Sequence, residues 1–275
     1  MHKKFKTAIF ILAGIALLGT LALLTASQNT SWITPAATLQ LPAKAAREAP
    51  TEITKQAGPD RELIILIHYP RAAKSGKPSG QGNTCPFKKL GKWPSNSLSY
   101  THNPSGSGLD EASASSALAA AFGSWDTASG ISITPAGTFT GSPSSYASGS
   151  MNGANEIGWA SLSAKGFSNA IAITYLWRTI AAKQILEADI VYNNDPGFGW
   201  FTAPTQTGDP NSWTSANTGL FDLINIASHE DGHFIGLDHV QETEHTLYPY
   251  SATDEVKKRS LECGDIAGAR NLYGA

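Results

Sequence analysis

Hydrophobic and polar positions form regular patterns mainly in the part of the chain that follows residue 92. Leu118, Ala121, Phe122 and Trp125 fall at positions i, i+3, i+4 and i+7, the spacing of one face of a helix. Three helices are predicted, at Leu109–Ala128, Leu220–Ile235 and Leu261–Tyr273. Five short runs rich in Ile, Val and aromatic residues predict strands at Ser97–Thr101, Ile131–Thr134, Asn155–Ala160, Ala170–Trp177 and Ile185–Tyr192.

This order of elements predicts an α+β fold. We expect a mixed, mostly five-stranded twisted sheet packed with two long helices. The second long helix is followed by an irregular C-terminal part that ends in a last short helix. We therefore assign residues 93–275 to one globular domain and expect it to be a monomer.

Residues 28–92 are basic and rich in Pro and Gly, which indicates a pro-segment or a linker. One apolar island, Glu62–Tyr69, has the composition of a strand. It belongs either to a small pro-domain or to the edge of the main sheet.

The N-terminus has the pattern of a targeting segment. The basic start MHKKFK precedes an uncharged apolar run over residues 8–24, and Thr25, Ala26 and Ser27 offer a cleavage site. The run is long for a signal peptide and short for a membrane span. Residues 1–27 are thus either a cleaved signal peptide or an uncleaved anchor. The rest of the chain is expected outside the cytoplasm: secreted, extracellular or periplasmic, or anchored to the membrane by residues 8–24.

Composition and charge exclude some classes of protein. Hydrophobic residues make up 41% of the chain, enough for a core, and charged residues make up only 15%. Residues 1–92 carry a net charge of +9, and residues 93–275 carry −11. The acidic main domain would repel phosphate, so we expect no nucleic-acid partner. A membrane partner is expected only if the N-terminal segment stays uncleaved.

The chemistry of the chain is concentrated at the end of the second long helix. The sequence there reads His229-Glu230-x-x-His233-x-x-Gly236-x-x-His239. Residues four apart share a helix face, so His229 and His233 can bind one ion. His239 reaches the same ion only if the helix breaks, and Gly236 is placed to break it in a left-handed conformation. Three neutral imidazoles and a water make a catalytic zinc site.

Glu230 lies one step around the helix from the first ligand. Zinc lowers the pKa of its water and polarises a carbonyl, and Glu230 is placed to take the water's proton as general base. The full eleven-residue pattern arises by chance in roughly one of 10⁵ chains of this composition.

The motif HEDGHFIGLDH is similar to the metzincin signature, and its Gly-Leu-Asp-His part resembles the matrixin branch. Weaker likenesses at residues 93–100, 120–125, 187–193 and 264–274 extend the resemblance over the main domain. It implies a matrixin-like zinc metalloprotease with a minimal catalytic domain of the bacterial type. Such an endopeptidase cleaves proteins or peptides, with the extended substrate antiparallel to a sheet edge.

The chain departs from the family pattern in the turn under the metal. The family has a Met there, and this chain has Leu247, an apolar residue of similar volume. Pro249 takes a position at which other metzincin branches place a zinc-binding Tyr. A second, structural zinc site is not predicted, because His68 and His102 are isolated in the sequence. Oxygen ligands for calcium are available at Asp189, Asn193, Asn194 and Asp195, although turn formation explains the same residues.

The two cysteines have three interpretations. An exported chain with an even number of cysteines is expected to form a disulfide. Matrixin geometry brings the start of the catalytic domain against the last helix, which implies a Cys85–Cys263 bond. Gly264 stands where the family has the first of two Asp residues. Alternatively, Cys85 blocks the zinc as a propeptide switch, or both thiols are free.

Two functions therefore remain. The first is a secreted zinc endopeptidase. The second is a zinc-binding module of the same fold that acts in adhesion or binding without turnover. Retention of Glu230 favours the enzyme, because binding zinc does not require that carboxylate.

Overall fold

The computed structural model describes residues 49–71, 85–202 and 218–274. The N-terminal signal or anchor segment predicted at residues 1–27 lies outside these ranges. Within them, none of the helices combines the length and the apolar character needed to cross a bilayer.

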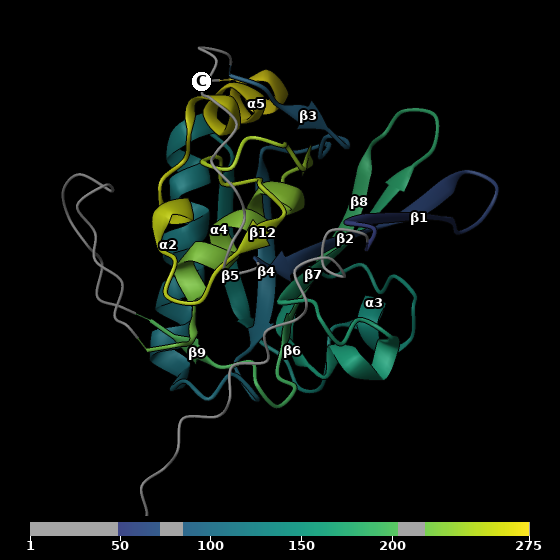
Figure 1. Cartoon of the computed structure of the whole chain (residues 1–275). Coiled ribbons are helices and arrows are strands. Elements are labelled where there is room, and N and C mark those ends of the chain that lie inside the picture. Colours follow the sequence, from purple (N-terminus) through teal and green to yellow (C-terminus); the bar gives the residue numbers. More distant parts are fainter. Residues whose placement is uncertain (1–48, 72–84, 203–217, 275) are drawn as a thin grey trace, which may run out of the picture. The chain divides into compact units, whose positions relative to one another are not determined.

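The described part of the chain contains both strands and helices, in agreement with the predicted α+β fold (Figure 1). The strands are β1 (Glu52–Gln56), β2 (Arg61–Pro70), β3 (Lys88–Lys89), β4 (Ser97–Asn103), β5 (Ser132–Thr138), β6 (Glu156–Ala160), β7 (Ala172–Thr179), β8 (Ile185–Asn193), β9 (Trp200–Phe201), β10 (Phe221–Asp222), β11 (Leu237–Asp238) and β12 (Tyr250–Ser251). The helices are α2 (Glu111–Ser129), α3 (Ser144–Ala147), α4 (Leu223–Phe234) and α5 (Cys263–Tyr273), with 3₁₀ turns at Leu162–Lys165 and Lys257–Arg259. The three predicted helices are thus confirmed as α2, α4 and α5.

The main sheet has the strand order β1-β2-β7-β8-β6-β4-β5, and β12 pairs with β2 beside this path. Neighbours from β8 to β5 are parallel, whereas β7 is antiparallel to both β8 and β2. The five strands predicted from the sequence are β4 to β8. The expected count was too low, because β1 and β2 from the upstream segment and β12 from the C-terminal part extend the same sheet. Of the two placements open for Glu62–Tyr69, the structure has the one in the main sheet.

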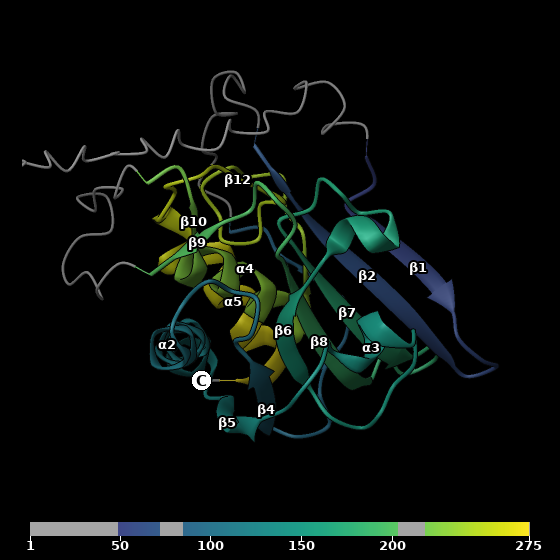
Figure 2. The same cartoon turned by 90° about the horizontal axis from the view of Figure 1, so that it is seen from below.

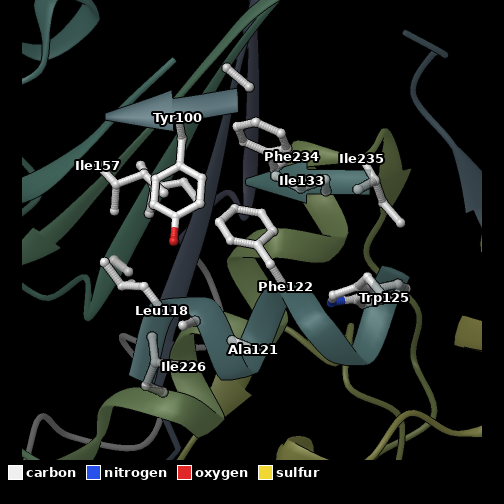
Figure 3. Packing of buried hydrophobic residues seen from close by; sticks show 14 of the residues in the cluster. Tyr100, Leu118, Ala121, Phe122, Trp125, Ile133, Ile157, Ile226, Phe234 and Ile235 are labelled. Carbon is white, nitrogen blue, oxygen red and sulfur yellow. The ribbon is translucent and has the colours of Figure 1, made fainter. Parts of the chain in front are cut away.

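Two helices and the sheet enclose the larger core. Helix α2 begins where the Asp110 side chain accepts a hydrogen bond from Ser113 N, and it ends at Gly130, whose φ is +68°. Its buried stripe includes Leu118 and Phe122, and the Phe122 ring packs edge to face against Phe234 of α4 (Figure 3). The hydrophobic spacing along the predicted helix therefore identified the face that enters the core.

A smaller core fills the opposite face of the sheet. It contains alternate residues of β2 (Leu63, Ile65 and Ile67) and residues of β7, β8 and the adjoining loops. Figure 2 shows α2, α4 and α5 on one side of the sheet and α3 on the other. Both faces of β2 are therefore covered, which explains why its central run, Leu63–Ile67, is apolar rather than alternating.

Candidate active site

Helix α4 carries the predicted motif and is buried along its whole length. Its first turn is capped by Asp222, whose side chain accepts a hydrogen bond from Asn225 N at 2.7 Å. The Asp222 carboxylate also forms an ion pair with Arg259. These two contacts fix the N-terminus of α4 in a region where unpaired polar groups would be costly.

The three predicted ligands converge on one point. The Nε2 atoms of His229, His233 and His239 lie 3.1–3.2 Å from one another. The Nδ1 atom of His229 is 2.7 Å from Thr246 O, and that of His233 is 2.8 Å from Leu237 O. Each Nδ1–H donates to its carbonyl, so each Nε2 presents its lone pair to the centre of the cluster.

The residues at this point fit a zinc ion. Zinc–nitrogen bonds of about 2.0–2.1 Å in a tetrahedral site would separate the nitrogens by about 3.3–3.4 Å, close to the observed spacing. Burial lowers the pKa of His233 to about 4 and holds those of His229 and His239 well below the usual value. All three rings are thus neutral at pH 7, the form that binds metal.

The helix stops where the third ligand requires it. Ile235 caps α4, and Gly236 follows with φ +100°. A Cβ atom at Gly236 would lie 2.3 Å from Gly91 O, so the position also lacks room for any side chain. The chain then turns back through β11 and brings His239 to the cluster.

Glu230 is fully buried, and both of its carboxylate oxygens have partners. Oε2 accepts a hydrogen bond from Thr174 Oγ1 at 2.6 Å, and Oε1 lies 3.1 Å from His68 Nδ1. Burial raises the pKa of Glu230 to about 8. The carboxylate lies beside the ligand cluster, but in this state it is engaged by the sheet.

His68 is the residue of the site that the sequence analysis missed. It lies at the end of β2, has no exposed surface, and its ring centroid is 3.8 Å from that of His229. Its Nε2 atom lies 3.0 Å from Ser251 Oγ and 3.1 Å from Lys258 Nζ. The one signal available was a histidine on the strand face that otherwise holds Ile64 and Leu66.

The segment after His239 forms the floor of the cluster. Leu247 is fully buried, and its Cδ2 atom would be 2.6 Å from a Cβ at Gly232 of α4. Its carbonyl accepts a hydrogen bond from Val240 N at 3.1 Å. Pro249 O accepts one from Tyr69 N at 3.0 Å. Leu247 therefore packs directly under the zinc helix, and Pro249 faces β2.

The two cysteines are joined in the structure. Cys85 and Cys263 form a disulfide, with Cα atoms 5.2 Å apart. Beside it, a Cβ at Gly264 would lie 2.2 Å from Pro86 O, so an Asp at this position would collide with the chain. Asp265 instead accepts hydrogen bonds from Thr246 N and Glu262 N at 3.0 and 2.8 Å. The last helix is thereby linked both to residue 85 and to the segment under the metal.

Calcium is not supported at the oxygen-rich residues. Asp189 accepts hydrogen bonds from Ser145 N and Glu156 N, and Asp195 accepts them from Ser161 and Ser163. Asn193 Oδ1 accepts from Asp195 N, so these oxygens face N–H and O–H donors. Turn formation and strand pairing account for them. The metal-ligand clusters found within the described ranges involve only His68, His229, Glu230, His233 and His239.

Comparisons with known proteins match the C-terminal part of the chain. The matrixin family model matches residues 192–274. Metalloendoproteinase 1 of Glycine max is 42% identical over 57 residues, which are 21% of this chain and 18% of the relative. Matrix metalloproteinase-27 of Homo sapiens is 32% identical over 79 residues, 29% of this chain and 15% of the relative. Stromelysin-1 of Mus musculus is 36% identical over 67 residues, 24% and 14% respectively. The chain thus spans less than a fifth of the length of each of these relatives.

Proposed function

We propose that this chain, which is similar to matrixins over the segment that carries its three-histidine cluster, is a secreted zinc endopeptidase. His229, His233 and His239 hold one zinc ion, and Glu230 is the general base in the hydrolysis of peptide bonds. The observation that carries this proposal is the convergence of three buried Nε2 atoms beside a carboxylate.

When bound, zinc supplies a Lewis acid that polarises a carbonyl and lowers the pKa of water. The protein's own groups do the rest. Thr246 O and Leu237 O orient two of the rings through Nδ1–H. Glu230 accepts the proton of the attacking water and passes it to the leaving amine. Thr174 holds one Glu230 oxygen in place, so the other oxygen is the one that water would reach once His68 has left it.

The same contacts support a latent form of the enzyme. His68 occupies the second oxygen of Glu230, and β2 covers the β7 edge beside it. We assign residues 1–27 to the export signal, 28–92 to a pro-segment and 93–275 to the catalytic domain. Removal of the hairpin β1–β2 would give water access to Glu230 and lower its raised pKa, because burial is the main cause of the shift. The Cys85–Cys263 disulfide suits an oxidising compartment.

The proposal is tested by zinc analysis and by hydrolysis of denatured casein. The full chain is assayed before and after limited trypsin treatment, with trypsin then blocked by an inhibitor. Chelator-sensitive hydrolysis is expected after the treatment. Glu230→Ala, treated in parallel, should keep its zinc and lose at least about 10²-fold in rate. His233→Ala should lose both zinc and activity. Zinc binding that survives loss of all three histidines would refute the site.

The full burial of Glu230 is also consistent with a second function, because a buried carboxylate does not act on water. A zinc-binding module for adhesion or binding would use the same histidines and never release the carboxylate. It predicts full zinc occupancy and no hydrolysis of casein or gelatin after removal of residues 49–71. Hydrolysis that is abolished in Glu230→Ala excludes this alternative.

A further inference from the structure

Strand β2 runs through a slot that the rest of the domain forms. On one side it pairs antiparallel with β7 from Arg61↔Thr179 to His68↔Ala172. On the other side, its last residues pair in parallel with β12, and Tyr69 N donates to Pro249 O. At His68 the slot is thus bounded by the sheet edge and by the segment that follows the third zinc ligand. An extended polypeptide fits this slot through main-chain hydrogen bonds on both sides.

The side chain of His68 fills a pocket at the zinc end of the slot. The ring of His229 forms one wall, and Glu230, Ser251 and Lys258 surround the two ring nitrogens. Nδ1–H donates to the Glu230 carboxylate, so Nε2 is the acceptor. Its single lone pair is shared by the Ser251 hydroxyl and Lys258 Nζ, which lie 3.0 and 3.1 Å away. The pocket therefore presents two donors to one acceptor atom.

Lys258 is fully buried, which is rare for a lysine side chain. It lies on the 3₁₀ turn Lys257–Arg259, where its backbone N–H donates to Asn225 Oδ1 at 2.8 Å. Its ammonium group donates to Tyr248 O and to His68 Nε2. Across the described ranges, no carboxylate lies within ion-pair distance of it. The adjacent cations differ in this respect, since Arg259 pairs with Asp222 and Lys257 with Glu244.

Departure of β2 would leave the Ser251 hydroxyl and one N–H of Lys258 facing an empty pocket, whereas Lys258 would keep its hydrogen bond to Tyr248 O. A buried donor without an acceptor is costly, so the pocket favours a replacement side chain that accepts a hydrogen bond. An aliphatic side chain would fill the space and leave the Ser251 hydroxyl and that N–H of Lys258 without an acceptor. Lys258 donates in either charge state, so this preference does not depend on its ionisation.

We propose that Lys258, with Ser251, is a specificity-determining residue. The substrate is an extended polypeptide that replaces β2 in the slot and places an acceptor side chain (Gln, Glu or His) next to the scissile bond. Gln matches the pocket on both sides, because its carbonyl accepts from Lys258 and its amide donates toward Glu230. This proposal rests on the proposed endopeptidase function and names the substrate class of that site.

The first test needs no catalysis, because position 68 serves as a built-in ligand. His68→Gln and His68→Leu are made in the full chain, with and without Lys258→Met, and the denaturant midpoint is measured for each variant. With Lys258 present, Gln should retain the His68 midpoint and Leu should lower it. The Gln–Leu difference should become smaller with Met at position 258, because Ser251 remains as the second donor. A difference that persists unchanged overturns the role of Lys258.

A second variant keeps the double-mutant cycle informative if Lys258→Met fails to fold. Ser251→Ala removes the other donor and leaves the buried ammonium in place, so it replaces Lys258→Met if that variant loses its zinc or its cooperative unfolding. The expected result is a smaller Gln–Leu difference than in the parent chain. If the Gln–Leu difference in midpoint is the same in the parent, Lys258→Met and Ser251→Ala backgrounds, the proposal is contradicted.

The second test measures substrate choice directly. After trypsin treatment of the full chain, otherwise identical peptides with Gln or Leu at each position flanking the cut are compared by kcat/KM, and mass spectrometry locates the cut. At one flanking position, Gln should be preferred by about tenfold, the effect of one satisfied hydrogen bond to a charged donor. Lys258→Met should remove or reverse this preference. A preference for Leu in the parent enzyme overturns the inference. Failure to cleave any peptide with zinc bound refutes the endopeptidase function, and the midpoint cycle still decides the pocket.

Discussion

The five strands that the sequence predicted, β4 to β8, have two outer strands, β5 and β7, and these are protected in different ways. At one end β5 contains Pro135 and Gly137 and leaves all but Ile133 exposed. At the other end β7 has six buried residues of eight and is covered by β2 and then β1. A strand edge is normally protected by short length, by proline or by another element. The β5 edge is protected by its own sequence, whereas the β7 edge is protected by a separable hairpin.

Under the proposed function, the β7 edge is the one that binds substrate, whereas the β5 edge has a structural role only. Thr174 of β7 contacts Glu230, and no residue of β5 contacts the zinc cluster among the described contacts. Main-chain groups that must bind a substrate cannot be blocked permanently by proline or a bulge. Covering them with a segment from upstream in the chain keeps the edge intact and reversible. Each prediction below changes one edge or its attachments and leaves the other as a control.

The largest expected effect concerns the covalent attachment that follows the hairpin. The Cys85–Cys263 bond closes a loop with a sequence separation of 178 residues. Replacing both cysteines by Ser should lower the free energy of unfolding by about 4–5 kcal/mol in the chain-entropy model, measured by denaturant titration. Hydrolysis before trypsin treatment should remain low, since β2 keeps its pairing. Two free thiols in the unreduced, denatured parent protein would contradict the bond.

The next prediction compares matched core residues at the two edges. Leu66 of β2 and Ile133 of β5 both pack in the larger core. Leu66→Ala and Ile133→Ala should each cost about 2–5 kcal/mol in stability. Only Leu66→Ala should raise casein hydrolysis before trypsin treatment, because it loosens the strand over Glu230. Equal activation by both variants would mean that general destabilisation, not the covered edge, controls access.

The turn under the zinc helix is predicted to contribute packing alone. Leu247→Ala should destabilise the protein by about 2–5 kcal/mol through a cavity beneath Gly232. Leu247→Met conserves volume and should cost less than about 1.5 kcal/mol, with little change in casein hydrolysis. Activation of an otherwise inactive, trypsin-treated chain by Leu247→Met would instead identify the parent chain as a degenerate protease.

The smallest expected effects are the changes in stability caused by replacing one threonine on each edge, Thr174 in β7 and Thr134 in β5. Thr174→Val removes the hydroxyl that donates to buried Glu230 and should cost about 1.5–3 kcal/mol. Thr134→Val in β5 makes the same change at an exposed position and should stay within about 0.5 kcal/mol. Thermal unfolding of the two variants side by side measures the comparison. Equal costs would show that the contact with Glu230 has no net stabilising effect.

The same two edges explain what the sequence could predict. The convergence of the three histidines depends on spacing within eleven residues at one helix end, so local geometry was sufficient to predict it. Helix α2 was predicted because its buried face repeats with the helical period. The five central strands were identifiable from composition. Nothing local, however, indicates which strands become neighbours.

The site residues outside α4 depend on such long-range pairing. His68 and Glu230 are 162 residues apart, and their contact exists only because β2 pairs with β7 in one register. A shift of one residue would turn His68 to the opposite face. Lys258 lies on a 3₁₀ turn between two other basic residues, a pattern that usually indicates an exposed surface. Its burial follows from packing of that turn against α4, which no periodicity in the sequence encodes.

Because β2 is covalently attached to the domain that it covers, its effective concentration at the slot is high and independent of protein concentration. While the chain is continuous, the hairpin competes for its slot as an intramolecular ligand, at an effective concentration on the order of millimolar. After a cut between residues 71 and 85, the same contacts bind a separate molecule. Occupancy of the slot then depends on how much released hairpin remains nearby. Under the proposed function, dilution would therefore complete the activation that the cut begins, and a concentrated preparation would remain partly inhibited by its own released hairpin.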